Sequence, residues 1–314
     1  DVNAQVYSPF AKVNWTVSDQ LFLSAGLRYE HTKYDYDNKL SNGSACEAGI
    51  SNCRFTRTSD QNTKFDEVSY QFGGHYFLSE QHTTYAQYST GYRAPQATEL
   101  FRLQAGQSVT DLKPEQVDSI ELGVRGQTQR FIYDVSAFTM NKKHFIFQDT
   151  NRQNISNGET SHNGIEFALG YQLPKGFYLK ANGTLANHSY ESSLTLSREN
   201  INGNEIDTAP QHMGSVQLGW QGAQESKVEL EWAHLGNYYL NPENTAQYKG
   251  HNLLNLRAST KINNRLTISA RVLNIANEDY AERADFGFGS YRYFVGEPRS
   301  VFVSLTYEFN HKSG

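Results

Sequence analysis

The chain has 314 residues, of which 38% are apolar and 13% aromatic, and its formal net charge is −5. The charge excludes a strongly basic nucleic-acid footprint, and the aromatic content excludes a disordered chain. A membrane-spanning helix needs about 20 consecutive apolar residues, whereas no apolar run here exceeds three. The mean hydropathy of −0.66 still allows a transmembrane β-barrel, because apolar and polar residues alternate along barrel strands.

Alternation with a period of two residues is the dominant pattern along the chain. Leu21, Leu23 and Ala25 alternate with Phe22 and Ser24, and the same alternation recurs up to the C-terminus. It predicts thirteen strands, at residues 5–16, 21–36, 63–77, 82–92, 116–125, 130–147, 161–173, 176–189, 211–221, 226–238, 251–262, 265–276 and 298–309.

The lengths of the predicted strands and connections favour a membrane barrel. Most of these strands have ten or more residues, and a tilted strand crosses a bilayer in about 9–11. Short and long connections alternate without exception, which is typical of barrels with short periplasmic turns and long external loops. We therefore predict an all-β fold, an antiparallel transmembrane β-barrel. A closed antiparallel barrel needs an even number of strands, so thirteen indicates either one miscounted strand or missing N-terminal strands. We favour missing strands, because the chain begins inside a strand pattern.

The C-terminal region carries the first family motif. Residues 272–309 resemble the C-terminal signature of TonB-dependent outer-membrane receptors, in which "V-x-N-[LI]-x-[ND]-x-x-Y" precedes "G-x-P-R" and a last strand ending in "Y-x-F". The matching residues are Val272, Asn274, Ile275, Asn277, Tyr280, Gly296, Pro298, Arg299, Tyr307 and Phe309.

A second motif stands about 180 residues earlier. The segment GYRAPQATEL at 91–100 is similar to the family's "G-[FY]-R-A-P-x-x-x-E-L" block, and LKPEQVDSIELGVRG at 112–126 resembles the strand entry that follows it. The matching residues of the first block are Gly91, Tyr92, Arg93, Ala94, Pro95, Glu99 and Leu100.

The resemblance implies a domain organisation. Barrels of this family have 22 strands and enclose an N-terminal plug. Thirteen strands ending at the last one would be the final thirteen of the 22, with the plug, the first nine strands and the TonB-contacting segment absent. We expect residues 1–309 to form the C-terminal part of the barrel and residues 310–314 to form a short tail.

The resemblance also implies a function and a location. We expect TonB-dependent active uptake of a bulky, scarce nutrient, most plausibly a ferric siderophore, across the bacterial outer membrane. The expected partners are TonB, outer-membrane lipid and lipopolysaccharide, and the siderophore or a similar ligand; no nucleic acid is expected. No cofactor or resident metal is expected, because the iron chelate would be the cargo.

Aromatic and arginine side chains on the external loops are the candidate ligand contacts. A metal chelate is large, partly aromatic and often anionic, so such a vestibule suits it. The alternative is that these side chains form the outer aromatic girdle or pack the loops together. The candidates are Tyr34, Tyr36, Phe101, Arg102, Tyr238, Tyr239, Tyr248, Phe286, Tyr291 and Arg292.

Two cysteines share the first long loop. Cys46 and Cys53 are separated by six residues, and in an exported protein we expect them to pair as a disulfide. The alternative, a metal pair, lacks two further ligands nearby.

Other functions stay open at this point. Haem, cobalamin or a carbohydrate could be the ligand, and a passive porin-like channel could use a similar barrel. We expect no enzyme: a barrel hydrolase would need a catalytic group at the loop end, where Asp35, Asp37, His188 and Ser290 stand without a supporting motif. A secreted β-sandwich is the remaining alternative.

Overall fold

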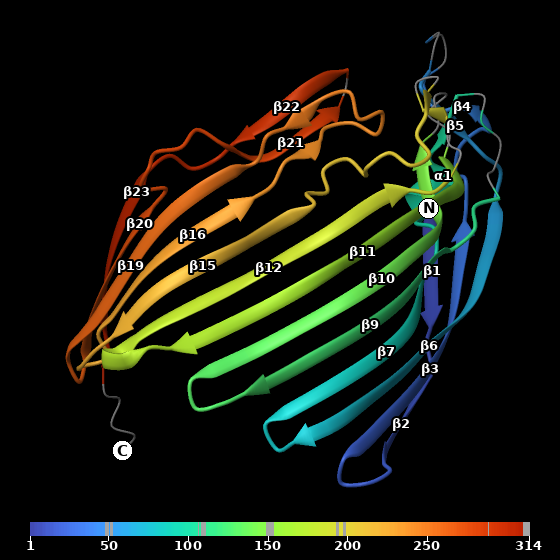
Figure 1. Ribbon diagram of the computed structural model, residues 1–314. Helices are drawn as coiled ribbons and strands as arrows, with labels where there is room; N and C mark the ends of the chain where they lie inside the picture. The colour runs from blue at the N-terminus through green and yellow to red at the C-terminus, as the bar shows by residue number, and fades with distance from the viewer. Residues whose placement is uncertain are drawn as a thin grey trace.

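One large curved sheet dominates the computed structural model (Figure 1). The structure describes residues 1–47, 50, 53–105, 107, 111–148, 154–192, 195–196, 199–287 and 289–309. The expected tail at 310–314 lies outside the described residues. Among the described residues, no helix is long and apolar enough to cross a membrane.

Every pairing in the main sheet is antiparallel, and neighbours in the sheet follow the order of the chain. Its strands are β1 (Val2–Tyr7), β2 (Phe10–Thr16), β3 (Leu21–Tyr36), β6 (Gln61–Ser79), β7 (His82–Arg93), β9 (Glu115–Gln127), β10 (Phe131–Gln148), β11 (Asn154–Gln172), β12 (Phe177–Tyr190), β15 (His212–Gln221), β16 (Lys227–Leu235), β19 (His251–Asn263), β20 (Leu266–Leu273) and β23 (Ser300–Tyr307).

These fourteen strands fill thirteen positions, because β1 and β2 both pair with β3. Tyr7 lies opposite His31 and Phe10 lies opposite Arg28, so the register is the same on both sides of the interruption at Ser8 and Pro9. Proline has no N–H to donate to a ladder, so it is confined to edge strands, ends and bulges. The thirteen predicted strands are confirmed, with ends that differ by a few residues.

The two faces of the sheet have opposite character. Leu122 on β9 pairs with Ala86 and Ala137 on its two neighbours and is 57% exposed. The residues on either side of Leu122, Glu121 and Gly123, point to the opposite face. There Glu121 lines a hollow with Asp134 and Glu166 of neighbouring strands, so this is the inner, concave face. A large sheet that exposes leucine and valine on its convex face fits a hydrocarbon environment, because water would disfavour so much exposed apolar area.

Aromatic side chains flank the apolar face at two heights. Such girdles mark the two membrane interfaces of barrels, where amphipathic rings sit at the headgroup level. The group near the short turns comprises Trp15, Tyr76, Tyr133, Tyr171, Trp220 and Tyr307. The group nearer the long loops comprises Tyr29, Tyr70, Tyr88 and Trp232.

The long connections carry their own small elements, which lie together at one end of the sheet (Figure 1). They are the sheet of β4 (Gly43–Ser44), β5 (Phe55–Arg57) and β8 (Leu103–Gln104), the pair β13 (Thr195–Leu196) and β14 (Glu199–Asn200), the pair β17 (Tyr238–Tyr239) and β18 (Gln247–Tyr248), the pair β21 (Ala281–Gly287) and β22 (Ser290–Val295), and the helix α1 (Ala97–Phe101). The 3-10 turn η1 (Pro174–Gly176) is at the opposite end, between β11 and β12.

The sheet is open. The described strand order begins at β1 and β2 and ends at β23, and within the described residues these edges do not pair with each other. With thirteen antiparallel positions, the first and the last strand run in the same direction, so they could not close the sheet by an antiparallel pairing. The sheet is therefore the wall of a barrel, without closure.

Candidate ligand-binding rim

The long connections pack into a rim above the wall, and we use "the rim" for residues 37–60, 94–114, 191–211, 236–250 and 274–299. Each segment joins two neighbouring strands, yet the segments also contact one another. In the first contact, β5 from residues 37–60 pairs with β8 from residues 94–114 through Phe55 opposite Gln104. The rim is thus held by contacts between residues far apart in the sequence.

Residues 191–211 and 236–250 are joined as well. The side-chain amide of Asn204 donates to the Pro242 carbonyl at 2.9 Å, and the backbone N–H of Glu205 donates to Asn244 Oδ1 at 2.8 Å. Nearby, the Tyr190 hydroxyl donates to Asp207 at 2.7 Å. Burial raises the pKa of Asp207, and this effect is larger than the lowering by the hydrogen bond from Tyr190.

Arg93 joins the second long connection to the wall. It is the last residue of β7, and both of its terminal nitrogens contact the Glu99 carboxylate on α1, at 3.0 and 3.2 Å. Its Nε donates to Glu115, the first residue of β9, at 2.9 Å. A guanidinium presents several donors in a fixed plane, so one arginine can serve two carboxylates.

Glu115 is buried beneath this arginine, with a side chain only 5% exposed. It lies twelve residues from the Gln127 end of β9, beyond the roughly 9–11 residues that cross the bilayer. Burial alone would raise its pKa, but hydrogen bonds from Arg93, the Ile146 backbone N–H and Lys142 outweigh burial and lower the pKa to about 2. The carboxylate is therefore charged under ordinary conditions.

Pro95, Glu99 and Leu100 position α1. The Glu99 carboxylate also accepts the backbone N–H of Gln96 at 2.6 Å, which completes the first turn of this short helix. Pro95 and Leu100 are buried, and Leu100 belongs to an apolar cluster with Phe101, Leu112 and Ile146. The motif residues therefore hold α1 against the strands of the wall.

Two candidate ligand residues, Tyr34 and Tyr36, pack onto this cluster, and a third, Phe101, belongs to it. Tyr34 and Tyr36 lie at the outer end of β3, in the strand and not in the loop that follows it. The Tyr36 ring stacks on Phe101 with centroids 4.8 Å apart, and the Tyr34 ring meets Phe101 edge-on at 6.3 Å. These contacts match the loop-packing interpretation, and a ligand contact stays a prediction.

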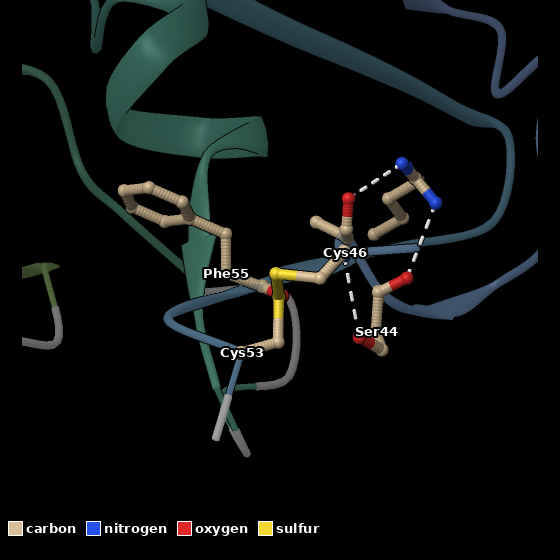
Figure 2. The surroundings of a disulfide bond; sticks show 6 residues. Ser44, Cys46, Cys53 and Phe55 are labelled. Atoms are coloured by element: carbon tan, nitrogen blue, oxygen red, sulfur yellow. Dashed lines mark hydrogen bonds between the residues drawn. A yellow bond between two sulfur atoms is a disulfide. The ribbon is translucent and has the colours of Figure 1, made fainter. Parts of the chain in front are cut away.

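A disulfide closes the tip of residues 37–60, where Cys46 and Cys53 are bonded (Figure 2). The guanidinium of Arg57 donates to the carbonyls of Ser44 and Ala45 at 3.1 and 2.7 Å. The ring of Phe55 points toward α1 in the same view. The bond and these hydrogen bonds hold β4 against β5, and β5 in turn pairs with β8.

Arg102 directly follows α1, and its guanidinium carbon lies 4.5 Å from the centroid of the Phe55 ring. Arg54 is placed against the same ring at 5.1 Å. Sequence reasoning singled out Arg102 but missed Arg54 and Phe55. Their position next to Cys53 could have indicated them, because a disulfide fixes its neighbours.

Two further candidate residues pack in the rim on the other side, where Tyr238 is buried and Tyr248 is partly buried. Tyr238 and Tyr248 form a cluster with Leu240, Ala281 and Ala284. The Tyr238 hydroxyl accepts the Ala284 N–H at 2.9 Å, and the Tyr248 hydroxyl accepts the Ala281 N–H at 3.1 Å. Both tyrosines thus join residues 236–250 to the β21–β22 hairpin.

The remaining candidates are more accessible. Phe286 and Tyr291 are both about half exposed near the end of the β21–β22 hairpin, with ring centroids 5.2 Å apart. Arg292 is held by Asp285 at 2.7 Å. Tyr239 pairs with Gln247 across β17 and β18. The ligand roles of all ten residues stay predictions.

In the C-terminal motif, Asn274 joins the two ends of the last long connection, and we call this set of hydrogen bonds the Asn274 lock. Asn274 is 2% exposed and has a positive φ of 49°. Its side-chain amide donates to the carbonyls of Glu278 and Glu297 at 2.9 and 3.2 Å, so it joins the two ends of the last long connection. A Cβ on Gly296 would lie 2.2 Å from the Tyr280 ring, so any other residue there would displace that ring.

The other residues of this motif lie next to the lock. The backbone N–H of Arg299 donates to Asn277 Oδ1 at 3.1 Å. Pro298 precedes it, and its carbonyl accepts the Ser300 hydroxyl at 2.9 Å. Phe309 lies beyond β23, is 86% exposed and meets Tyr307 edge-on at 4.8 Å. In the second motif, Gly91 and Tyr92 precede Arg93 at the end of β7, and Ala94 follows it.

The inner face of the wall is polar. Arg257 pairs with Glu231 at 2.8 Å, and Lys227 pairs with Glu229 at 3.0 Å. A hollow of about 590 Å³ on this face is lined by these cations together with Arg271. Among the residues described, no group of three or more histidine, cysteine, aspartate or glutamate side chains is arranged to hold a metal ion.

A wall with an apolar convex face, two aromatic girdles, short turns at one end and a packed rim at the other defines an outer-membrane barrel. The family model "TonB dependent receptor-like, beta-barrel" matches residues 1–275. The chain belongs to this family. Its place is the bacterial outer membrane.

Known relatives agree with this assignment. The chain is 19% identical over 303 residues to the catecholate siderophore receptor Fiu of Escherichia coli O6:H1, covering 91% of this chain and 39% of that protein. It is 20% identical over 259 residues to the vitamin B12 transporter BtuB of Photobacterium profundum, covering 81% and 40%. The chain thus spans about two fifths of the length of these relatives.

A solved structure shows the same fold. The ferric yersiniabactin uptake receptor FyuA from Yersinia pestis superposes with a TM-score of 0.79 at 17% identity, over 98% of this chain and 46% of FyuA. At this identity the likeness concerns the fold alone.

Proposed function

We propose that the protein takes up a bulky iron chelate, a ferric siderophore, across the outer membrane in a TonB-dependent manner. The observation that carries the proposal is the family match over residues 1–275 together with the packed rim. The relatives Fiu and FyuA are named for ferric siderophores, which supports iron chelates as the cargo.

In this proposal each part has a role. The rim contacts the chelate through its aromatic and arginine side chains. The polar inner face, with Arg257, Glu231 and Arg271, contacts a plug formed by chain outside the sequence described here. TonB acts on that chain, and the wall carries no chemistry of its own.

Vitamin B12 is the second candidate cargo, because BtuB is among the relatives. Growth tests separate the two. Cells that lack the gene should lose growth on a ferric siderophore as sole iron source and keep normal growth on limiting vitamin B12. Normal growth on every ferric chelate, with loss of growth on vitamin B12, would replace the proposal by the cobalamin alternative.

A further inference from the structure

Two arginines of the rim share one aromatic ring. The guanidinium carbons of Arg54 and Arg102 lie 5.1 and 4.5 Å from the centroid of the Phe55 ring, so they are no more than about 10 Å apart. Both side chains are exposed. Among the described residues no ion pair joins either guanidinium to a carboxylate; the nearby pairs belong to Arg93 and Lys142.

These side chains line a hollow in the rim. Its volume is about 230 Å³, and it is also lined by Thr98, Glu99, Gln104 and Asn154. Sites for whole ligands measure roughly 300–1,000 Å³. The hollow therefore has room for one group of a larger ligand and not for a complete chelate.

The hollow is positively charged. Among the lining residues that the structure describes, the one carboxylate is that of Glu99, which is already held by Arg93 and by the Gln96 backbone N–H. Two unpaired guanidiniums within a small concave surface create a positive potential that attracts an anion.

The hollow is also held in shape. The Arg54 carbonyl accepts the Ala105 N–H at 2.9 Å, and Phe55 pairs with Gln104 between β5 and β8. The Cys46–Cys53 disulfide closes the chain directly before Arg54. These contacts fix the backbone around the hollow, so little backbone entropy remains to be lost when a ligand enters, which favours binding.

We infer that Arg54, Phe55 and Arg102 form a subsite for a planar anionic group, a carboxylate or catecholate, on one arm of the transported chelate. A guanidinium matches the planar geometry of such a group and can stack on an aromatic ring, while the Phe55 face orients both guanidiniums. The inference rests on the proposed function for the chelate, but the anion site itself is testable without iron.

The test uses the full-length protein in detergent and two iron-free probes, benzoate and its neutral analogue benzamide. Binding is measured by calorimetry or ligand-observed NMR. The variant R54Q/R102Q should weaken benzoate binding by about ten-fold or more, because charge-assisted hydrogen bonds are lost. R54K/R102K keeps the charge without the planar donors and should bind benzoate with intermediate affinity.

The matched control is K39Q/K113Q, which removes the same charge from two exposed rim positions outside the hollow. It should change benzoate affinity by less than about two-fold, since exposed charges at a distance are screened by salt. Equal benzoate affinity in the wild type and R54Q/R102Q would overturn the subsite, and so would benzoate binding no tighter than benzamide binding. Arginine-dependent benzoate binding in a protein that supports no ferric-chelate uptake would overturn the proposed function and leave the subsite standing.

Discussion

At the scale of single residues, the family motifs act as braces between distant parts of the chain. Arg93 holds Glu99 on α1 and Glu115 on β9, and Asn274 holds both ends of the last connection. Each brace satisfies buried polar groups that would otherwise cost stability. The motif residues therefore shape the rim, and other side chains are left free to contact a ligand.

The Glu115 brace predicts a pH dependence. Because its pKa is lowered to about 2 from a usual value of 4.5, the stabilisation is fully present above pH 4.5 and is lost as the pH falls toward 2. Thermal unfolding of the full-length protein should show this loss in the wild type. In E115Q the unfolding midpoint at pH 7 should be lower, by the equivalent of about 1–3 kcal/mol. Between pH 4.5 and 2 the midpoint of E115Q should fall less than that of the wild type, because the variant has no Glu115 carboxylate to protonate. A wild-type and an E115Q curve of the same shape would contradict the brace.

The Asn274 lock gives a second prediction. N274A should destabilise the protein by about 1–3 kcal/mol, because the carbonyls of Glu278 and Glu297 each lose the hydrogen bond that the amide donates. N274G relieves the positive φ but loses the same hydrogen bonds, so it should stay well below the wild type in stability. A wild-type unfolding midpoint in N274G would show that backbone conformation, and not the amide, explains the asparagine.

At the scale of elements, alternation predicted the strands well because each strand has one apolar and one polar face. It could not place the break at Ser8 and Pro9, since the register continues across it. The short elements β5, β8 and α1 were missed. They depend on contacts between distant segments, such as Phe55 with Gln104, and no local pattern encodes such contacts.

The sequence predicted which types of residue lie in the candidate site better than it predicted how their side chains contact one another. Tyr36 and Phe101 were chosen as aromatic loop residues, and the structure stacks them on each other. Arg54 was overlooked, although its place next to Cys53 was a signal that could have indicated it. Burial and partners, which decide whether a side chain is available, arise only from the folded rim.

The disulfide gives a prediction for this element. Closing a ring between Cys46 and Cys53, seven positions apart, should stabilise the loop by about 2.5 kcal/mol in the chain-entropy description. C46S/C53S should therefore be cut faster by trypsin after Arg54 and Arg57, while cleavage after Arg130 in a turn at the far end stays unchanged. Equal cleavage rates at Arg54 and Arg57 with and without the disulfide would show that β5 and β8 hold the loop unaided.

At the scale of the whole molecule, the sheet is a membrane wall with two unpaired edges. β1 and β2 form one edge and β23 the other, and they run in the same direction. Unpaired strand edges are unstable in lipid, where water cannot satisfy the free N–H and C=O groups. Closure therefore requires further strands, in agreement with relatives that are more than twice as long.

The orientation of the wall is open to a direct test. L122K places a charge on the convex face and should destabilise the barrel by about 2–4 kcal/mol near the bilayer midplane. Q87K, on the concave face opposite Glu121, should have little effect. The stability of both variants is measured by the heat-modifiability of the full-length protein in outer membranes. If Q87K were the more damaging change, the assignment of the two faces would be reversed.

The central claim is energised uptake of an iron chelate through this barrel. The most direct measurement is accumulation of a radioactive iron siderophore complex by iron-starved cells that carry the full-length protein. The account predicts accumulation against a gradient that stops when TonB is deleted or the proton gradient is collapsed. Uptake that continues unchanged without TonB would contradict it and indicate a passive channel.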